Sequence, residues 1–540
     1  MSTGVFDPQA HAAAMRAQGV WHDELLNEHL ARSVAQTPEK PAVVAYRAGQ
    51  AQPERITYAE FEERVAKLAG AMRARGIGAG DIVGLQLPNW WEFAVTVLAC
   101  ERIGAVVNPL MPIFREHELS YMLGFAEAKM LIVPKIFRGF DHAAMAASLQ
   151  ARLPSLQHVI VVHGDGENSF ANLLQSGTPV HATHRALQPD AMAVLMFTSG
   201  TTGAPKGVMH SVNGILACTY AMSARAGLTD KDVVFGCSPL GHMTGYAASL
   251  ALSMQLGATL VLLDVWEARN GVAVMAAEGA SYIVASTPFL SDLCETVATG
   301  APRPTHLHRF ICGGAPIPPV LVERAARELD LQVCSLWGMT EALGATMTEP
   351  SRAAEKSSTT DGRALDGMEV CVTGADGKPL PLGETGDLLV RGAQMLLGYY
   401  KQPLEGIFTP DGWFATGDLA YLDTEGYIRI NGRTKDVLIR GGENVPVAEI
   451  ESLLYRHPAV ASVAIVGIPD ARLGERGCAF VALRPGAQLD LAGVQAYLNE
   501  AKVAKQYWPE RLEVLAALPC TPSGKIKKFV LKDQAKAFAT

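Results

Sequence analysis

Short, continuously apolar segments separated by helical stretches constrain the fold of this chain more than any other feature of its sequence. Segments 81–87, 90–104 and 105–110 follow one another with the patterns of a strand, a helix and a strand. Strands that are apolar throughout are typical of parallel sheets whose two faces are both covered. Further strands of this kind are expected at 191–197, 257–264, 281–286 and 308–314. The sequence therefore predicts a large layered α/β body.

Helix signals and changes of composition define the rest of the organisation. Thr57 and Glu60 have the spacing of a capping box, and the helical pattern that follows ends at Gly76. From about Cys371 short strands alternate with glycine-rich turns, which predicts a β-rich subdomain. After Gly432 a last block has the pattern of a small, mobile α+β domain. We expect an N-terminal domain at 1–433 and a C-terminal lid at 434–540.

Composition excludes several classes of protein. A net charge of −8 gives no general attraction to polyanions, so nucleic acid is not an expected partner. The nine cysteines include no C-x-x-C pair, which argues against a zinc cluster or a disulfide framework. No secretory signal is recognised at the N-terminus, and the uncharged stretch 245–263 is interpreted as a buried helix followed by a strand. A cytoplasmic protein without a transmembrane segment is expected.

The stretch from Phe197 to Gly207 directly follows a predicted buried strand and has the composition of a phosphate-binding loop. Glycines let backbone N–H groups converge on an anion, hydroxyl groups add donors, and Lys206 supplies positive charge. The loop is not a Walker A sequence, because Lys206 is followed by glycine. A flexible surface turn is the alternative interpretation of such a loop by itself. The candidate phosphate ligands are Thr198, Ser199, Gly200, Thr201, Thr202, Gly203 and Lys206.

The string TSGTTGAPKG at 198–207 resembles the signature of the adenylate-forming superfamily, which includes acyl-CoA synthetases, firefly luciferases and the adenylation domains of peptide synthetases. Further strings in the family's order extend the resemblance from about Thr57 to Lys525. The resemblance implies two half-reactions. A carboxylate and ATP give acyl-AMP and pyrophosphate, and a thiol then takes the acyl group and releases AMP. The implied cofactors are ATP, Mg²⁺ and coenzyme A.

The segment WGMTE at 337–341 resembles the family's aromatic-G-x-T-E string. The resemblance places Trp337 beside adenine, Thr340 at the α-phosphate and Glu341 on Mg²⁺, and it assigns Gly338 and Met339 to the ATP/AMP-binding site. An aromatic face suits a purine and a carboxylate suits a hard cation. The usual aromatic residue here is tyrosine, so this chain keeps the stacking surface without the hydroxyl. Taken alone, Trp337 would be interpreted as a core residue beside a turn.

Two other strings are similar to nucleotide-binding segments of the family. Gly313, Gly314 and Ala315 resemble the adenine-binding turn, where bare backbone approaches the base. Asp418 resembles the ribose-binding aspartate, and Arg433 would assist at the ribose or phosphate. Without the matching strings, an isolated aspartate or arginine would be interpreted as a solvated surface charge.

The C-terminal string TPSGK places Lys525 at the position of the family's catalytic lysine. An ammonium between the acid and the α-phosphate would offset the repulsion of two anions. The alternative interpretation is that Lys525 is only one of several lysines in a solvated basic tail. The resemblance also assigns a hinge to Lys435, and coenzyme A contacts to Gly441, Gly442 and Glu443, which could otherwise form an ordinary turn.

The segment at 238–242 lacks the aspartate that binds the α-amino group in amino-acid activators, and no carrier module follows Lys525. Coenzyme A is therefore the favoured acceptor. His242 resembles a residue that gates the acyl pocket, although a core histidine is the alternative; it is assigned a catalytic role together with Lys525 and Thr201. The predicted acyl pocket comprises His242, Met243, Tyr246, Thr287, Phe289 and Met339.

An apolar pocket favours a neutral acyl group. Strings at 87–93 and 108–114 are similar to those of cyclohexanecarboxylate-CoA ligases, with medium-chain fatty acids and aryl acids as rivals. Three alternatives stay open: a catalytically silent nucleotide sensor, a luciferase-like enzyme, and an adenylating enzyme with an acceptor other than coenzyme A. A homodimer also stays open.

Overall fold

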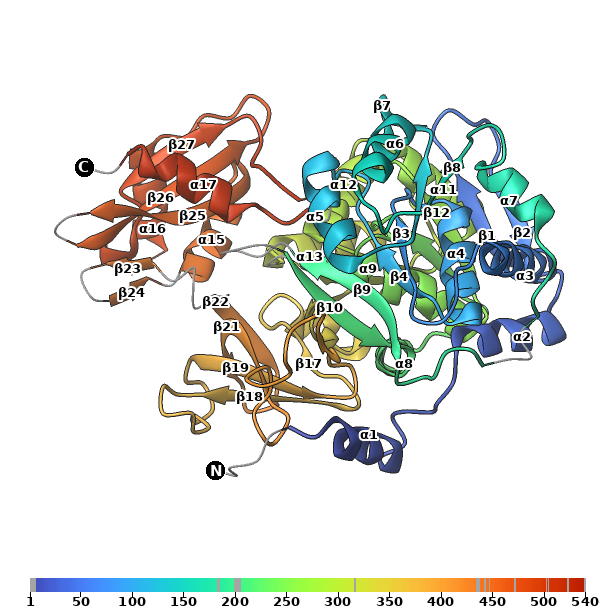
Figure 1. The fold of residues 1–540 in the computed structure, drawn as a ribbon. Coiled ribbons are helices and arrows are strands. Elements are labelled where there is room, and N and C mark those ends of the chain that lie inside the picture. The colour runs from blue at the N-terminus through green and yellow to red at the C-terminus, as the bar shows by residue number, and fades with distance from the viewer. Residues whose placement is uncertain are drawn as a thin grey trace.

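A computed structural model describes most of the chain. The described residues are 6–181, 185–198, 205–314, 317–433, 438–440, 443–445, 447–470, 473–501, 503, 505–521 and 524–538. Two large sheets with their helices and a smaller β-rich subdomain form the body, and a separate C-terminal domain stands beside it (Figure 1). The predicted fold class, a layered α/β body with a small α+β domain, is confirmed.

The first large sheet has nine strands, and its central strands are parallel. Their order is β17 (Arg363–Ala364), β16 (Leu343–Met347), β15 (Gln332–Met339), β14 (Arg309–Gly313), β13 (Tyr282–Ala285), β11 (Val233–Gly236), β12 (Thr259–Leu263), β1 (Pro41–Tyr46) and β2 (Glu54–Thr57). One face packs against three helices in a single hydrophobic cluster. These helices are α11 (Ala268–Glu278), α12 (Thr287–Ala298) and α13 (Pro319–Leu329).

The second large sheet has seven strands and carries the predicted phosphate-binding loop. Their order is β20 (Gly398–Tyr399), β10 (Lys206–Ser211), β9 (Met192–Thr198), β4 (Val106–Pro109), β3 (Ile82–Leu85), β5 (Met130–Pro134) and β8 (His158–Val162). Three helices share one core with strands of both sheets: α3 (Tyr58–Ala74), α4 (Trp91–Ile103) and α8 (Val212–Ala226). The main core of the body therefore lies between the two sheets.

Several local predictions are confirmed. Thr57 caps α3, because its hydroxyl accepts from the Glu60 N–H while the Glu60 carboxylate accepts from the Thr57 N–H. The uncharged stretch forms α9 (Met243–Gly245), a π-helical segment (Tyr246–Ala251), α10 (Leu252–Leu256) and then β12. None of the described helices is long and apolar enough to cross a membrane.

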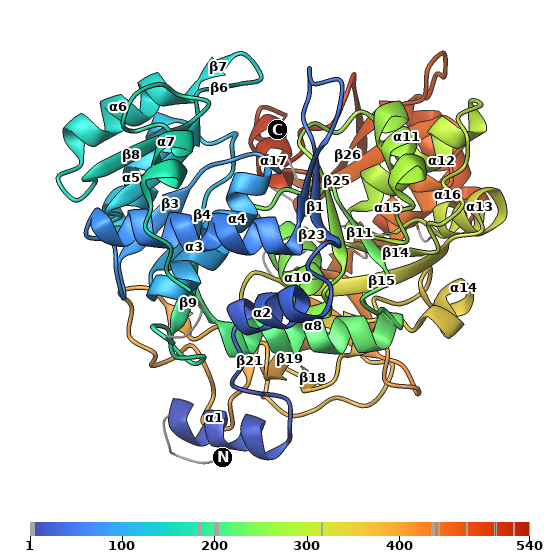
Figure 2. The same ribbon diagram turned by 90° about the vertical axis from the view of Figure 1, so that its right-hand side faces the viewer.

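The β-rich subdomain is an antiparallel sheet that ends at Arg433. Its strands are β18 (Met368–Thr373), β19 (Gly386–Gly392), β21 (Phe414–Leu422) and β22 (Ile428–Arg433). Figures 1 and 2 show the N-terminal helix α1 (Pro8–Ala17) at the bottom of the body, where Met15 packs with Trp21 and with Ala217 of α8.

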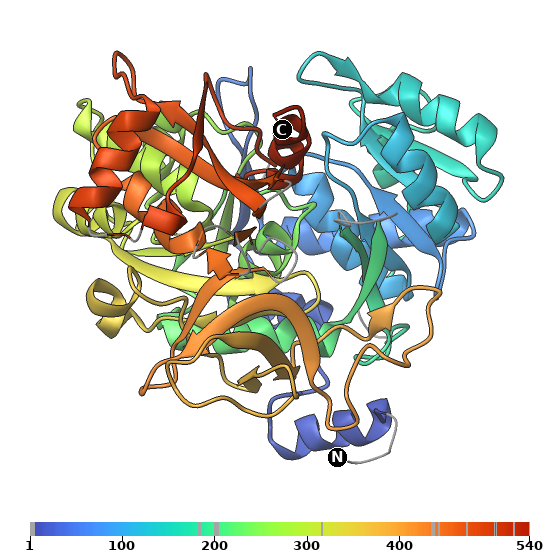
Figure 3. The same cartoon turned by 90° about the vertical axis from the view of Figure 1, so that its left-hand side faces the viewer.

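The C-terminal domain has its own sheet and two hydrophobic clusters. Figures 1 and 3 both show this domain above the β-rich subdomain. Helix α16 ends at Glu500, and a short 3₁₀-helix follows at Lys505–Tyr507. The elements are β23 (Leu438–Arg440), β24 (Glu443–Val445), α15 (Val447–Tyr455), β25 (Val460–Asp470), β26 (Gly474–Leu483), α16 (Leu491–Glu500), β27 (Arg511–Leu515) and α17 (Lys528–Lys536).

Candidate active site

The predicted phosphate-binding loop connects two antiparallel strands. Thr198 at the end of β9 pairs with Lys206 at the start of β10, so the loop is the connection of a hairpin. Lys206 Nζ lies 4.5 Å from the centre of the Tyr399 ring. The loop residues Ser199, Gly200, Thr201, Thr202 and Gly203 lie outside the described residues, and their phosphate-binding and catalytic roles stay predictions.

The turn between β15 and β16 carries Thr340 and Glu341, and side chains from other elements hold it. The Tyr399 hydroxyl donates to Glu341 Oε1 at 3.1 Å, and the Leu396 N–H donates to the Glu341 carbonyl at 2.8 Å. His210 Nε2 lies 2.6 Å from the Thr340 carbonyl oxygen. Burial, and then the neighbouring Glu341 charge, raise the pKa of Tyr399, so its phenol stays a donor. The predicted metal ligand is therefore oriented before any ligand arrives.

Glycine is required at Gly338, on the strand that leads into this turn. A Cβ atom at this position would lie only 1.9 Å from the Leu343 carbonyl oxygen on the neighbouring strand. Strands β15 and β16 thus approach each other so closely at Gly338 that no side chain fits there. This explains the glycine of the WGMTE string through packing within the turn.

Trp337 and Asp418, predicted to contact adenine and ribose, are in direct contact with each other. The Trp337 indole N–H donates to Asp418 Oδ2 at 2.9 Å, and both side chains are buried. Asp418 pairs with Arg433 across β21 and β22, although the Arg433 side chain lies outside the described residues. The tryptophan that replaces the family's usual tyrosine therefore positions the predicted ribose ligand.

The predicted adenine-binding turn follows β14, directly beside the strand of Trp337. Gly313 pairs with Leu336, and a Cβ atom at Gly313 would lie 2.6 Å from the Leu336 carbonyl oxygen. Gly314 has a φ of +83°, a conformation that favours glycine. Ala315 lies outside the described residues. The glycines thus bring bare backbone next to the segment predicted to contact the base.

His242 caps the short helix α9 at the carboxyl end of the first sheet. Its Nδ1 accepts from the Thr244 N–H at 3.2 Å. Burial and the positive charge of Lys525 lower the pKa of His242 to about 4. The imidazole is therefore neutral near pH 7, and the ammonium of Lys525 acts on it from the C-terminal domain.

The residues predicted to line the acyl pocket fall into separate clusters. Met243 and Tyr246 belong to the core between the two sheets. Phe289 packs instead against Trp266, with ring centres 5.0 Å apart, beneath the outer helices. Thr287 Oγ1 lies 3.7 Å from Cys312 Sγ, and Met339 packs with the cluster that contains Trp337. Met243 and Tyr246 thus belong to one hydrophobic cluster and Phe289 to another, and their place in an acyl pocket stays a prediction.

Lys525 lies in a tight turn that contacts the body. The Thr521 N–H donates to the Lys525 carbonyl at 2.7 Å, and the Lys525 N–H donates to the Thr521 hydroxyl at 3.0 Å. Gly524 has a φ of +81°, and a Cβ atom there would lie 2.5 Å from Ser286 Oγ at the start of α12. The C-terminal domain is therefore placed with its predicted catalytic turn against the body.

The predicted hinge and coenzyme A contacts cannot be placed. Lys435, Gly441 and Gly442 lie outside the described residues, as does the side chain of Glu443, whose backbone belongs to β24. These roles stay predictions.

The site fits a magnesium ion that is shared with substrate phosphates. Among the described residues, no group of three His, Cys, Asp or Glu side chains is spaced to hold a metal ion. Mg²⁺ is commonly bound by one or two carboxylates together with phosphate oxygens. Glu341, buried and oriented by Tyr399, offers one such carboxylate.

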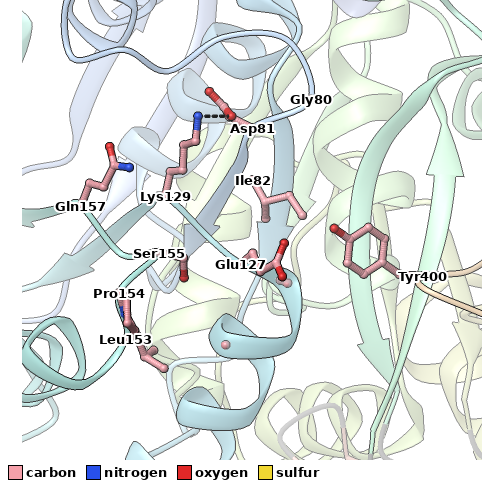
Figure 4. A pocket seen from close by; sticks show the side chains of 12 residues that line it. Gly80, Asp81, Ile82, Glu127, Lys129, Leu153, Pro154, Ser155, Gln157 and Tyr400 are labelled. Atoms are coloured by element: carbon pink, nitrogen blue, oxygen red, sulfur yellow. Dashed lines mark ion pairs between the residues drawn. The ribbon is translucent and has the colours of Figure 1, made fainter.

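A cavity lies where strands β3, β5 and β8 begin (Figure 4). Its volume is about 550 Å³, and Asp81 and Lys129 form an ion pair of 2.6 Å on its wall, near Glu127 and Tyr400. None of the predicted site residues that the structure describes lines this cavity.

Three residues near the site were not predicted from the sequence: His210, Tyr399 and Ser286. Each contacts a segment far away in the chain, so no local spacing indicates it. Only one weak sequence signal indicated His210: it stands in a strand that follows the glycine-rich loop. A buried histidine at such a place usually has a polar partner.

Comparison with known proteins was made for the sequence and for the structure. Residues 30–400 match the family of AMP-binding enzymes, and residues 449–525 match the C-terminal domain of AMP-binding enzymes. The medium-chain fatty-acid–CoA ligase of Escherichia coli (strain K12) is 36% identical, with 96% of this chain and 92% of the relative covered. The salicylyl-CoA synthase/salicylate adenylyltransferase of a Streptomyces species is 34% identical, with 98% and 97% covered.

Solved structures agree with the sequence comparisons. The ATP-bound crystal structure of MatB from Rhodopseudomonas palustris superimposes with a TM-score of 0.83 at 28% identity, and 95% of this chain and 100% of that chain are covered. The similarity thus includes both the body and the C-terminal domain.

Proposed function

Because the chain belongs to the AMP-binding enzyme family, we propose that it is a carboxylic acid–coenzyme A ligase that forms an acyl-AMP intermediate. The acid and ATP give acyl-AMP and pyrophosphate, and coenzyme A then takes the acyl group and releases AMP. ATP and coenzyme A are co-substrates, and Mg²⁺ accompanies ATP.

One observation supports this proposal most strongly. Lys525 comes from the C-terminal domain, yet its charge acts on His242 in the body, and the adjacent Gly524 contacts Ser286. A nucleotide sensor has no need of an ammonium delivered across a domain boundary. An enzyme that joins two anions does, because that charge offsets the repulsion between the carboxylate and the α-phosphate.

The roles of the other residues follow from their contacts. Asp418, oriented by Trp337, would accept both ribose hydroxyls, and Gly313 and Gly314 would admit the adenine ring. Thr340 and Lys206 would hold phosphate oxygens. Glu341 would ligate the Mg²⁺ ion, which supplies further positive charge when bound. The chemistry then requires positioning and charge neutralisation, with no covalent bond to the enzyme.

We propose that the acid is apolar: alicyclic, medium-chain or aryl. Met243 and Tyr246, which follow His242 in the chain, are buried in a hydrophobic cluster, and His242 is neutral near pH 7. A neutral wall disfavours a second charge on the acid. Relatives that act on a medium-chain fatty acid and on salicylate are consistent with this range.

We propose that the second half-reaction uses a rotation of the C-terminal domain, residues 434–540, about Lys435. Strand β22 ends at Arg433 and β23 begins at Leu438, so the proposed hinge lies between the two sheets. Rotation would withdraw Lys525 and bring Gly441, Gly442 and Glu443 toward coenzyme A.

A panel of acids tests the function. Enzyme and Mg-ATP are mixed with octanoate, cyclohexanecarboxylate, benzoate, salicylate or glycine, and pyrophosphate is measured before and AMP after coenzyme A is added. We expect acid-dependent pyrophosphate and coenzyme A-dependent AMP with at least one apolar acid, and none with glycine. ATP binding without pyrophosphate release for any acid would contradict the ligase and favour a sensor. Pyrophosphate without coenzyme A-dependent turnover would indicate another acceptor.

A further inference from the structure

Strand β10 begins at the phosphate-binding loop, and its residue His210 contacts the turn that carries Thr340 and Glu341. Side chains alternate along a strand, so Lys206, Val208 and His210 lie on the same face. Val208 belongs to the cluster that contains Trp337 and Tyr399. The face of β10 that begins with the predicted phosphate ligand therefore ends with a histidine.

His210 is completely buried and is used for one hydrogen bond. Nε2 lies 2.6 Å from the Thr340 carbonyl oxygen, so this nitrogen carries the proton and donates. Nδ1 is buried without a partner among the described residues, as expected for a nitrogen that carries no proton. Because this is the one hydrogen bond that the His210 side chain makes among the described residues, we expect its role to be to hold the Thr340 carbonyl in place.

The two carbonyls of the turn are held by His210 on β10 and by Leu396, which lies just before β20, the neighbouring strand of the same sheet. The Thr340 carbonyl accepts from His210, and the Glu341 carbonyl accepts from the Leu396 N–H. The segment with Leu396 continues into β20, where Tyr399 pairs with Val208 of β10 and donates to Glu341 Oε1. The orientation of the Glu341 carboxylate thus depends on β10 from two sides.

We propose that His210 is a positioning residue for Mg-ATP: its N–H fixes the peptide between Thr340 and Glu341, which directs the hydroxyl and the carboxylate toward the phosphates. This inference rests on the proposed function only in taking Thr340 and Glu341 as the contacts of the nucleotide. Without the donor, the carbonyl is buried unpaired and the turn relaxes toward another partner. The acid lies on the side of His242 and Lys525, so its binding should change little.

Two substitutions and a control test the role. His210→Met removes the donor and keeps an apolar side chain of similar length, whereas His210→Gln offers an amide N–H at comparable reach. His142→Gln is the matched control, because His142 is also fully buried and contacts Gln86. Mg-ATP affinity is measured by calorimetry without acid, and KM is then measured for ATP and for the acid.

We expect His210→Met to weaken Mg-ATP binding about tenfold, and to raise KM for ATP equally, as for loss of a buried hydrogen bond. KM for the acid should stay within about twofold, and His210→Gln should recover most of the affinity. His142→Gln should bind Mg-ATP like the wild type. Thioester formation from supplied acyl-AMP should persist in all three variants.

The proposal is overturned if folded His210→Met binds Mg-ATP as the wild type does, or if it loses ATP and acid affinity equally with no recovery in His210→Gln. If His210→Met does not fold, His210→Asn, whose amide is too short to reach, replaces it with the same expectations. The calorimetric comparison remains decisive even if no acid supports turnover, so failure of the ligase assignment is distinguishable from failure of this inference.

Discussion

The nucleotide side of the site and the turn that carries Lys525 are built in different ways. Trp337 holds Asp418, and Tyr399 holds Glu341, through buried hydrogen bonds within the body. The Lys525 turn is closed by its own bonds with Thr521, and it meets the body through the bare backbone of Gly524. The first region is preorganised, whereas the second is placed by contact between domains.

This difference assigns the two regions to different steps. If the proposed function is correct, a preorganised nucleotide side should bind ATP in any position of the C-terminal domain. A lysine that reaches the body from a separate domain can leave when that domain moves, which suits an enzyme whose second half-reaction needs another group in its place. Changes on the nucleotide side should therefore alter ATP binding, and changes in the lysine turn should alter adenylation.

Removal of the ammonium gives the largest expected effect. Lys525→Ala should slow acyl-adenylate formation by about 10³-fold, because a charge that stabilises the transition state is lost. Thioester formation from supplied acyl-AMP should stay within about twofold. Pyrophosphate release and single-turnover thioester formation measure the two steps. Lys527→Ala is the control, and equal effects of the two substitutions would support the interpretation that these lysines form only a solvated tail. Loss of both adenylation and thioester formation in Lys525→Ala would contradict the assignment of Lys525 to adenylation alone.

A methyl group at Gly524, where the lysine turn meets Ser286, gives the second-largest expected effect. In Gly524→Ala, the new Cβ atom would lie 2.5 Å from Ser286 Oγ and 3.1 Å from Pro288 Cγ, so the turn or these side chains must shift. We expect adenylation to fall roughly ten- to hundredfold, as for a small misplacement of a catalytic group, with ATP binding unchanged.

Gly486→Ala is the matched control, because Gly486 also has a positive φ, of +77°, but a Cβ atom there would have nothing within 4 Å. Both variants carry the same kind of backbone strain. Equal adenylation rates in the two would show that the contact with Ser286 is unimportant.

Loss of one hydrogen bond on the nucleotide side should have the smallest effect. Trp337→Phe removes the N–H that reaches Asp418 and keeps an aromatic face, so KM for ATP should rise about tenfold. The rate of adenylation at saturating ATP should change little. Trp21→Phe removes a comparable bond, to the Ala393 carbonyl far from the site, and should leave KM for ATP unchanged. A fall in rate at saturating ATP would contradict the assignment of this region to binding.

The elements of the fold were predictable because their signals are local. The Thr57 capping box and the apolar strands have short sequence patterns, and the structure confirms them. Their division into two sheets was not predictable, since it depends on pairings between distant strands. For the same reason, the antiparallel pairing of β10 with β9, which makes the phosphate-binding loop a hairpin, was not anticipated.

Strings of residues indicated the candidate site, as for Trp337 and Asp418, and the roles assigned to these residues stay predictions. The contact between these two side chains was not predictable, because they stand on different sheets and far apart in the chain. The place of Phe289 in the acyl pocket stays a prediction, and the contact of its ring with Trp266 was not indicated by its segment. Tyr399 has no local pattern that indicates its role on Glu341.

The pKa of His242 tests most directly whether the lysine of the C-terminal domain reaches the body. Burial, and then the charge of Lys525, lower the pKa of this histidine from 6.5 to about 4. NMR titration of histidine-labelled protein, with His242→Gln to assign the signal, gives the pKa in the wild type and in Lys525→Ala. The account predicts a higher pKa in Lys525→Ala, still below 6.5 because the ring remains buried. An identical pKa in the two proteins would contradict it.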